Sequence, residues 1–173
     1  AGIPGTVAGL IHALEQYGTL DLKTVMQPAI DLAEKGFAVP AALHLNLRSA
    51  AKRLGRNEEA NRIYLGGTGT APAMGTLFKQ PDLAATLKLV RDKGFDGFYK
   101  GKTATLIAAE MQRGGGVMNA DDLASYRAIE RKPVRASFRG YDIVSAPPPS
   151  SGGVHVSQIL KLLEPYPIED MGH

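Results

Sequence analysis

The stretch PGTVAGLIHALEQYG, residues 4–18, sets the fold class of this chain. Its apolar side chains recur at positions i, i+3, i+4 and i+7, the spacing that places them on one helix face: Val7, Leu10, Ile11 and Leu14. Pro4 suits the first helical position, and Gly18 ends the stretch. The pattern predicts an amphipathic helix that packs one face against the rest of the protein.

The helical period recurs through most of the chain that follows. A second periodic stretch runs from Leu22 to Gly36, with Asp21 as its possible N-cap. Pro28 lies inside this stretch, which is therefore predicted to be either one kinked helix or two short helices. Further helical segments are predicted from Pro40 to Gly55, Asn57 to Ile63, Pro81 to Gly94, Gly101 to Gly114, after the cap residue Asn119, and through Val156, Ile159, Leu160 and Leu163. We therefore expect residues 1–65 to be entirely helical.

Only one segment replaces the helical spacing with the alternation of apolar and polar residues that is typical of a strand. Val134, Ala136 and Phe138 alternate with polar residues, and Arg139-Gly140 can turn the chain into a second strand from Tyr141 to Ser145. The glycine-rich stretch at residues 66–75 has no period and predicts a loop that loosely divides the chain. The expected fold class is mainly α, with a small β-hairpin near residues 132–145.

Composition narrows the function classes. The chain has 173 residues, and its 44% hydrophobic residues suffice for a core. It contains no cysteine, which excludes a disulfide scaffold, a thiolate nucleophile and Cys-ligated zinc or iron–sulfur sites. The net charge of +3 is interspersed along the sequence and gives no support to nucleic-acid binding. No apolar run approaches the roughly 18–20 residues of a membrane span.

Ser151 and His155 are the sharpest candidate pair for nucleophilic catalysis. On a helix, residues at i and i+4 share a face, and a neutral imidazole can accept a hydroxyl proton. We favour a structural interpretation, in which Ser150 or Ser151 caps the following helix while Gly152 and Gly153 permit close packing. No acidic third member is identifiable, and the G-x-S-x-G context is missing.

Other chemistry-bearing residues also receive structural interpretations. The four histidines lack metal-ligand spacing: His12, His44, His155 and His173. The run Gly66–Thr70 lacks the Lys-Ser/Thr ending of a phosphate-binding loop, and Asp121 and Asp122 are favoured by the N-terminal end of a helix. Four basic residues form the solvated face of the hairpin: Arg131, Lys132, Arg135 and Arg139. We therefore assign no catalytic, cofactor-binding or metal-binding residue in this chain.

Four segments, in order, resemble the large subunit of the γ-glutamyltranspeptidase family. They are GIPGTVAGL (2–10), YGTLDLKTVMQPAIDLAEKGF (17–37), GFYKGKTATLIAAEMQRGGGVMNADDLASY (97–126) and RGYDIVSAPPPSSGG (139–153). The last is the most specific, and the match between residues 38 and 80 is only general. Thr6, Ser150 and Ser151 fall within these scaffold motifs.

The resemblance implies an αββα N-terminal nucleophile hydrolase that cleaves itself to expose a catalytic threonine. The family's threonine and γ-glutamyl-binding residues lie downstream of His173, and its substrate-carboxylate arginine lies upstream of GIPGTVAGL. Residues 1–173 are accordingly expected to be a helical large-subunit domain within a longer precursor, because Ala1 is not methionine and Glu169–His173 complete no element. The expected partners are the rest of the large subunit and the catalytic small subunit, with no nucleic acid, no cofactor, and self-association of the isolated piece through exposed apolar patches.

Two classes of function stay open at this point. The first is a scaffold portion of a γ-glutamyltransferase or glutathione hydrolase, or of the related cephalosporin acylases. The second is a non-catalytic helical interaction domain. Within the first class, transfer and hydrolysis, the acceptor and the γ-glutamyl compound are all open, and the resemblance implies a periplasmic or extracellular location.

Overall fold

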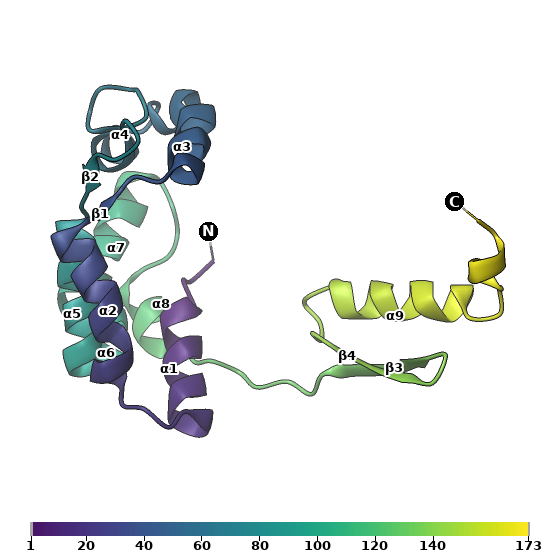
Figure 1. The fold of residues 1–173 in the computed structure, drawn as a ribbon. Coiled ribbons are helices and arrows are strands. Elements are labelled where there is room, and N and C mark those ends of the chain that lie inside the picture. The colour runs from purple at the N-terminus through teal and green to yellow at the C-terminus, as the bar shows by residue number, and fades with distance from the viewer. Residues whose placement is uncertain (1, 173) are drawn as a thin grey trace. The chain divides into compact units, whose positions relative to one another are not determined.

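The computed structural model describes residues 2–172. The chain forms two compact units that meet between Ala128 and Ile129 in the sequence. Figure 1 shows helices throughout and strands only in short pairs, so the predicted mainly α class is confirmed. The 66–75 stretch is a loop, as predicted, and it lies inside the first unit. The first unit holds α1 (Thr6–Tyr17), α2 (Leu22–Lys35), β1 (Phe37–Ala38), α3 (Ala41–Leu54), α4 (Glu58–Leu65), β2 (Leu77–Phe78), α5 (Pro81–Lys93), α6 (Asp96–Tyr99), α7 (Gly101–Arg113) and α8 (Ala120–Ser125).

The predicted first helix is α1, which begins at Thr6 rather than at Pro4. Its N-cap is Gly5, whose lack of a side chain leaves the first backbone N–H groups without a local acceptor. Ala8 and Ile11 are buried, whereas Leu10 is 67% exposed. The apolar face of the helix is therefore only partly covered within this unit.

A single helix spans the stretch that contains Pro28. In α2 the Asp21 side chain accepts a hydrogen bond from the Thr24 backbone N–H at 2.8 Å, which confirms the predicted cap. The buried residues Ile30 and Ala33 lie beyond the proline, and α2 packs along α5 (Figure 1). Packing on α5 outweighs the hydrogen bond that a proline removes from a helix, so the one-helix alternative holds.

Residues 1–65 are not entirely helical, because Phe37 and Ala38 form a short antiparallel pair with Phe78 and Leu77. The pairing continues beyond the strands, where the Val39 N–H donates to the Thr76 carbonyl at 2.9 Å. Two residues are too few to show an alternating pattern, and their partner comes about 40 residues later. The prediction was wrong here because the signal for this strand is not local.

Apart from the short α6, which the sequence did not predict, the remaining helices of this unit begin and end close to the predicted residues. Asn57 caps α4 by accepting from the Ala60 N–H at 2.8 Å, and α4 runs to Leu65, two residues past the predicted end. Asn119 and Asp122 form a reciprocal capping box at α8, which accounts for the Asp122 carboxylate without catalysis. Gly97 allows α6 to reach the backbone of α5, since a Cβ there would collide with the Leu89 carbonyl oxygen.

The second unit contains the predicted hairpin, β3 (Val134–Phe138) and β4 (Tyr141–Ser145), followed by α9 (Gly152–Leu163) and the short 3-10 helix η1 (Ile168–Asp170). The strands pair antiparallel from Val134 with Ser145 to Phe138 with Tyr141, and Arg139 and Gly140 turn with positive φ values of 47° and 85°. The hairpin is thus confirmed, and α9 packs against β3 and β4.

The connection into α9 differs in detail from the prediction. Ser151 occupies the N-cap position, but its side chain makes no capping hydrogen bond. Gly152 has open space around it, with the Ser150 Oγ at 3.7 Å as the nearest neighbour of an added Cβ. Gly153 is buried, and a Cβ there would collide with the Ala146 carbonyl oxygen. Close approach therefore requires Gly153 and not Gly152.

Candidate functional site

The side chains of Ser151 and His155 are not in contact through any hydrogen bond among the described residues. The His155 backbone N–H donates to the Ser151 carbonyl at 2.9 Å, which is an ordinary helical hydrogen bond. Both residues are exposed. Their shared turn of α9 thus lacks both the hydroxyl–imidazole contact and an acidic partner that a nucleophilic serine requires.

His12, His44 and His155, the described histidines, do not converge on a metal site. Within residues 2–172 there is no group of three or more His, Cys, Asp or Glu side chains placed to hold a metal ion. The ring Nδ1 of His44 lies 2.8 Å from the Pro72 carbonyl oxygen, which ties α3 to the 66–75 loop. His173 lies outside the described residues.

Backbone N–H groups of the glycine-rich run Gly66–Thr70 donate hydrogen bonds within the protein. The Gly67 N–H donates to the Asn61 carbonyl at 3.0 Å, and the Gly69 N–H donates to the Asn61 side-chain oxygen at 3.0 Å. The Thr68 hydroxyl donates to the Leu65 carbonyl at 2.8 Å. The loop is thus closed on the end of α4, and these N–H groups do not converge on an anion as a phosphate-binding loop requires.

The prediction placed Arg139 on the solvated face of the hairpin. In the structure Arg139 also makes specific contacts, which corrects that prediction. It lies in the hairpin turn, where its backbone N–H donates to the Glu164 carboxylate at 3.1 Å and its guanidinium donates to the Tyr166 carbonyl. The guanidinium also lies over the Phe138 ring at 5.2 Å. Arg139 therefore fastens the hairpin turn to the C-terminal end of α9.

The first unit anchors its N-terminal segment on one buried tyrosine. Tyr99 is fully buried, and its hydroxyl accepts from the Ala8 N–H at 3.1 Å and donates to the Pro4 carbonyl at 2.6 Å. Its ring stacks on Phe95 and Tyr126, with centroids 4.3 and 5.6 Å away. Burial raises the pKa of the Tyr99 hydroxyl above its ordinary value.

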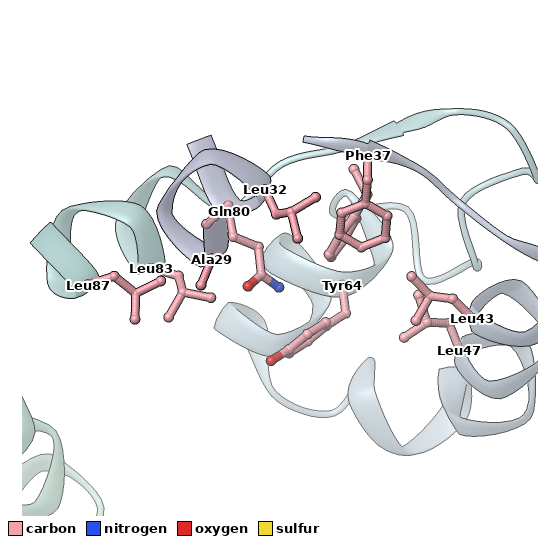
Figure 2. A pocket seen from close by; sticks show the side chains of 11 residues that line it. Ala29, Leu32, Phe37, Leu43, Leu47, Tyr64, Gln80, Leu83 and Leu87 are labelled. Carbon is pink, nitrogen blue, oxygen red and sulfur yellow. The ribbon is translucent and has the colours of Figure 1, made fainter. Parts of the chain in front are cut away.

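An apolar pocket of about 380 Å³ opens among α2, β1, α3, α4, β2 and α5 (Figure 2). Leucine side chains and three aromatic rings line most of it, and the Phe37 and Phe78 rings meet edge to face with centroids 5.8 Å apart. Figure 2 shows the amide of Gln80 and the hydroxyl of Tyr64 as polar groups among the apolar side chains. The size and the mixture of apolar walls with a few polar groups are typical of small-molecule pockets.

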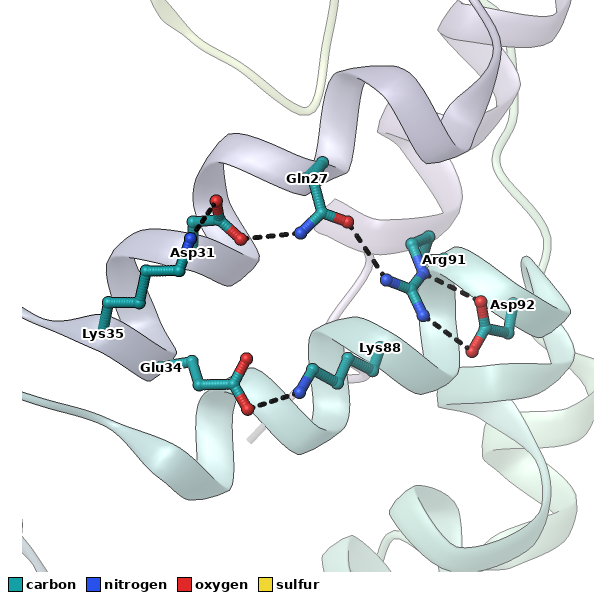
Figure 3. Close-up of polar contacts among 7 residues, drawn as sticks. All are labelled: Gln27, Asp31, Glu34, Lys35, Lys88, Arg91 and Asp92. Atoms are coloured by element: carbon teal, nitrogen blue, oxygen red, sulfur yellow. Dashed lines mark hydrogen bonds and ion pairs between the residues drawn. The ribbon is translucent and has the colours of Figure 1, made fainter.

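Polar contacts also join α2 to α5 (Figure 3). Lys88 of α5 donates to Glu34 of α2 at 2.5 Å, and Arg91 donates to the Gln27 side-chain oxygen at 3.1 Å. Within α2, Asp31 accepts from Lys35 at 2.8 Å, and this hydrogen bond lowers the pKa of Asp31. These groups are partly or largely solvated, so each contributes little to stability.

Sequence reasoning missed Tyr99 and the pocket residues Tyr64 and Gln80, and it did not separate Gly153, which makes the predicted close approach, from Gly152, which does not. Tyr64 and Gln80 stand 16 positions apart on either side of the loop and share no motif. The fully buried Tyr99 carries no sequence signal beyond its aromatic neighbours, because its partners Pro4 and Ala8 are more than 90 residues away.

Comparisons with known proteins match the chain over its whole length. A family model described as Gamma-glutamyltranspeptidase matches residues 1–173. The glutathione hydrolase proenzyme of Escherichia coli (strain K12) is 42% identical over 99% of this chain and 30% of its own length. The Acylase ACY 1 proenzyme of Pseudomonas sp. (strain SE83) is 42% identical over 98% of this chain and 30% of its own length.

A solved structure has the same fold. The crystal structure of Helicobacter pylori gamma-glutamyltranspeptidase superposes with a TM-score of 0.95 at 41% identity, covering 100% of this chain and 50% of that one. The chain thus spans about 30% of the length of the curated relatives it matches. No helix within residues 2–172 is long and apolar enough to cross a membrane.

Proposed function

Because this chain belongs to the gamma-glutamyltranspeptidase family, we propose that it is a scaffold portion of the large subunit of a γ-glutamyltransferase or glutathione hydrolase. The single observation that carries the proposal is the match of all 173 residues to the family, together with 42% identity to a glutathione hydrolase proenzyme. The isolated helical interaction domain is the weaker alternative, since it explains neither match.

The proposed chemistry belongs to residues outside this chain. A threonine hydroxyl attacks the γ-amide carbonyl of glutathione, its proton passes to the threonine's own α-amine, and backbone N–H groups stabilise the oxyanion. The proton then goes to the leaving amine of cysteinylglycine as the C–N bond breaks and a γ-glutamyl ester remains. Water releases glutamate from this ester, or an amine acceptor takes the γ-glutamyl group, and either route regenerates the threonine.

Residues 1–173 contribute packing and positioning in this proposal. Tyr99 holds Pro4 and Ala8 at the start of α1. The family resemblance implies a substrate-carboxylate arginine upstream of that segment. The helices would cover one side of the αββα sandwich of the parent enzyme, next to the rest of the large subunit and the small subunit. A periplasmic or extracellular location belongs to the same proposal and rests on the resemblance alone.

A cephalosporin acylase-like activity is the second candidate, because an acylase proenzyme is as similar to this chain as a glutathione hydrolase proenzyme is, at 42% identity each. The sequence of a scaffold segment that contacts no substrate is not constrained by the acyl group that the enzyme cleaves, so its identity to a relative does not indicate the substrate. The substrate choice therefore lies with residues that this segment does not contain.

The test uses the full-length polypeptide that carries residues 1–173. We expect it to cleave itself into two subunits and to release p-nitroaniline from γ-glutamyl-p-nitroanilide, faster when glycylglycine is added as an acceptor if transfer operates. Glutaryl-7-aminocephalosporanic acid serves as the acylase substrate. Self-cleavage with turnover of only the glutaryl substrate would favour the acylase, and the absence of turnover on both would contradict the proposal.

A further inference from the structure

The outward side of α3 carries four basic residues that are interspersed in the sequence and brought together by the helix. They are Arg48, Lys52, Arg53 and Arg56, and all four are exposed. Residues four positions apart lie on one side of a helix, about 6 Å apart along its axis. The backbone stays helical at Gly55, with φ −65° and ψ −13°, so Arg48, Lys52 and Arg56 follow one another along that side. We call the four residues the α3 basic row, in which Arg53 lies beside the other three.

Among the described residues, no side chain pairs with the α3 basic row. None of its four side chains makes an ion pair or a hydrogen bond within residues 2–172. The helix contains no acidic residue, and the nearest carboxylates along the chain, Glu58 and Glu59, belong to α4. Glu59 is already paired with Arg62 at 2.8 Å.

The surroundings of the row keep a positive excess when the nearby carboxylates are counted. Arg56 lines a hollow together with three glutamates and one arginine: Glu58, Glu59, Glu110 and Arg113. Glu110 pairs with Arg113, while Arg62 is shared between Glu59 and Asp82. The α3 basic row and these neighbours together have six basic and four acidic side chains.

The charge count of the first unit places its positive excess in the same stretch. That unit has 15 Lys and Arg residues and 12 Asp and Glu residues. Residues 41–65, which form α3 and α4, contain five of the basic and two of the acidic residues. Basic and acidic residues are equal in number over the rest of the unit, so its net charge arises in this stretch.

The helix dipole explains only part of the row. Cations are favoured in the last turn of a helix, where Lys52 and Arg53 lie. Arg48 stands a full turn earlier and gains little from the dipole. Elsewhere in the unit, Lys35 and Lys100 are each paired with an aspartate four residues away. A row of unpaired cations is instead suited to a partner that brings negative charge.

We propose that the α3 basic row binds an extended acidic segment of a polypeptide. In an extended chain, alternate side chains lie on the same side about 6.7 Å apart, which is close to the spacing along the helix. Alternate carboxylates therefore reach Arg48, Lys52 and Arg56 in turn. Leu45, which is 49% exposed and lies one turn before Arg48, offers an apolar contact at the end of the row.

A narrow acidic chain fits the row better than a flat anionic surface does. A membrane that touched Arg56 would also approach Glu58, because both residues line the same hollow. An extended chain can follow α3 from Leu45 to Arg56 and end there. The row contains none of the groups that the proposed γ-glutamyl chemistry uses, so this binding goes beyond the proposed function and is measured separately from turnover.

The test uses the full-length polypeptide that carries residues 1–173 and a synthetic peptide of five Glu-Ser repeats, followed by ligand-observed NMR titration in a low-salt buffer. A few solvated charge pairs should give a Kd on the order of 1 mM. Saturable binding should disappear in about 1 M salt, where the Debye length is about 3 Å. Peptides of five Gln-Ser or five Lys-Ser repeats should show no saturable binding.

Charge-removing variants localise the binding. Arg48→Gln combined with Lys52→Gln should raise the Kd by about threefold to tenfold, and Arg48→Glu combined with Lys52→Glu should abolish saturable binding. The matched control is Lys79→Gln combined with Lys102→Gln, which removes two exposed lysines that make no ion pair in the described chain. Its Kd should equal that of the parent protein. All these side chains are exposed, and thermal melting verifies that each variant is folded.

Several outcomes would overturn the proposal. Equal Kd values for the α3 variants and the control variant would remove the α3 basic row from it, and no saturable binding of the acidic peptide in low salt would refute the site. Vesicles of phosphatidylglycerol and a single-stranded oligonucleotide serve as competing partners. Loss of binding to either of these in Arg48→Glu with Lys52→Glu, without any binding of the peptide, would replace the acidic polypeptide by a membrane or a nucleic acid. Self-cleavage and γ-glutamyl turnover should be unchanged in the α3 variants, so failure of this proposal is distinct from failure of the proposed function.

Discussion

The hydroxyl of Tyr99 accepts a hydrogen bond from the backbone N–H of Ala8 at 3.1 Å, across 91 residues of sequence. Ala8 belongs to the first turn of α1, whose N-cap Gly5 offers no side-chain acceptor. The same hydroxyl donates to the Pro4 carbonyl at 2.6 Å. A buried residue of α6 thus supplies the cap that the local sequence of α1 lacks.

We predict that Tyr99→Phe destabilises the protein by about 1–3 kcal/mol, because it leaves the buried Ala8 N–H and the Pro4 carbonyl without a partner. The ring stacking on Phe95 and Tyr126 stays intact in this variant. Urea unfolding measures the change. Tyr64→Phe is the matched control, since the Tyr64 hydroxyl makes no hydrogen bond within residues 2–172, and its free energy of unfolding should stay within about 0.5 kcal/mol of the parent.

Tyr99 should also make stability fall at alkaline pH. Burial raises the pKa of its hydroxyl above the ordinary value of 10.0, so the unfolded chain loses this proton at a lower pH than the folded chain. The contribution is fully present below that ordinary value and is lost as the pH rises through the folded-state pKa. Unfolding free energies at about pH 8 and about pH 11 should differ less for Tyr99→Phe than for Tyr64→Phe. Equal differences would contradict the role of Tyr99.

Two adjacent glycines should respond differently to alanine. Gly153→Ala drives a Cβ into the Ala146 carbonyl oxygen and should cost about 1–3 kcal/mol. Gly152→Ala meets only the Ser150 Oγ at 3.7 Å and should change stability by no more than about 0.5 kcal/mol. In the full-length enzyme, Gly153→Ala should lower the yield of self-cleaved protein while kcat per titrated site stays near the parent value. A hundredfold loss per site with unchanged stability would place this turn in the transition state, since that factor corresponds to about 2.7 kcal/mol.

The ion pair between Glu34 and Lys88 should contribute far less than the core beneath it. A double-mutant cycle with Glu34→Gln and Lys88→Met should give a coupling of about 0.2–1 kcal/mol that disappears in high salt, because both side chains are partly solvated. Ile30→Ala, at a fully buried position of the same helix, should cost about 2–5 kcal/mol. A larger coupling from the ion pair than from Ile30 would show that polar contacts dominate the α2–α5 interface.

The 173-residue chain alone should not release p-nitroaniline from γ-glutamyl-p-nitroanilide above the uncatalysed rate. In the proposed mechanism the nucleophile, the general base and the oxyanion donors all lie elsewhere, and Ser151 and His155 share only a backbone hydrogen bond. The assay compares the chain with its Ser151→Ala variant. Turnover that survives purification and is lost in Ser151→Ala would refute this prediction and restore the serine–histidine pair.

The sequence determined the features that depend on a few neighbouring residues. The periodic apolar positions predicted the helices, and the side chains of Asp21, Asn57 and Asn119 cap the helices that begin just after them. The alternation from Val134 to Phe138 predicted the hairpin, with its turn at Arg139 and Gly140. These signals act within one helical turn or one strand pair, so they can be read without knowing what else is nearby.

Only the tertiary structure decided the remaining features. Pro28 stays inside one helix because α5 packs on α2, and β1 exists because β2 comes back to it after the 66–75 loop. The Tyr99 anchor, the Gly153 contact and the apolar pocket beside Tyr64 and Gln80 each depend on atoms from separate elements. Burial, close approach and hydrogen bonding between distant residues are properties of the packed chain, and no local pattern encodes which partners packing will bring together.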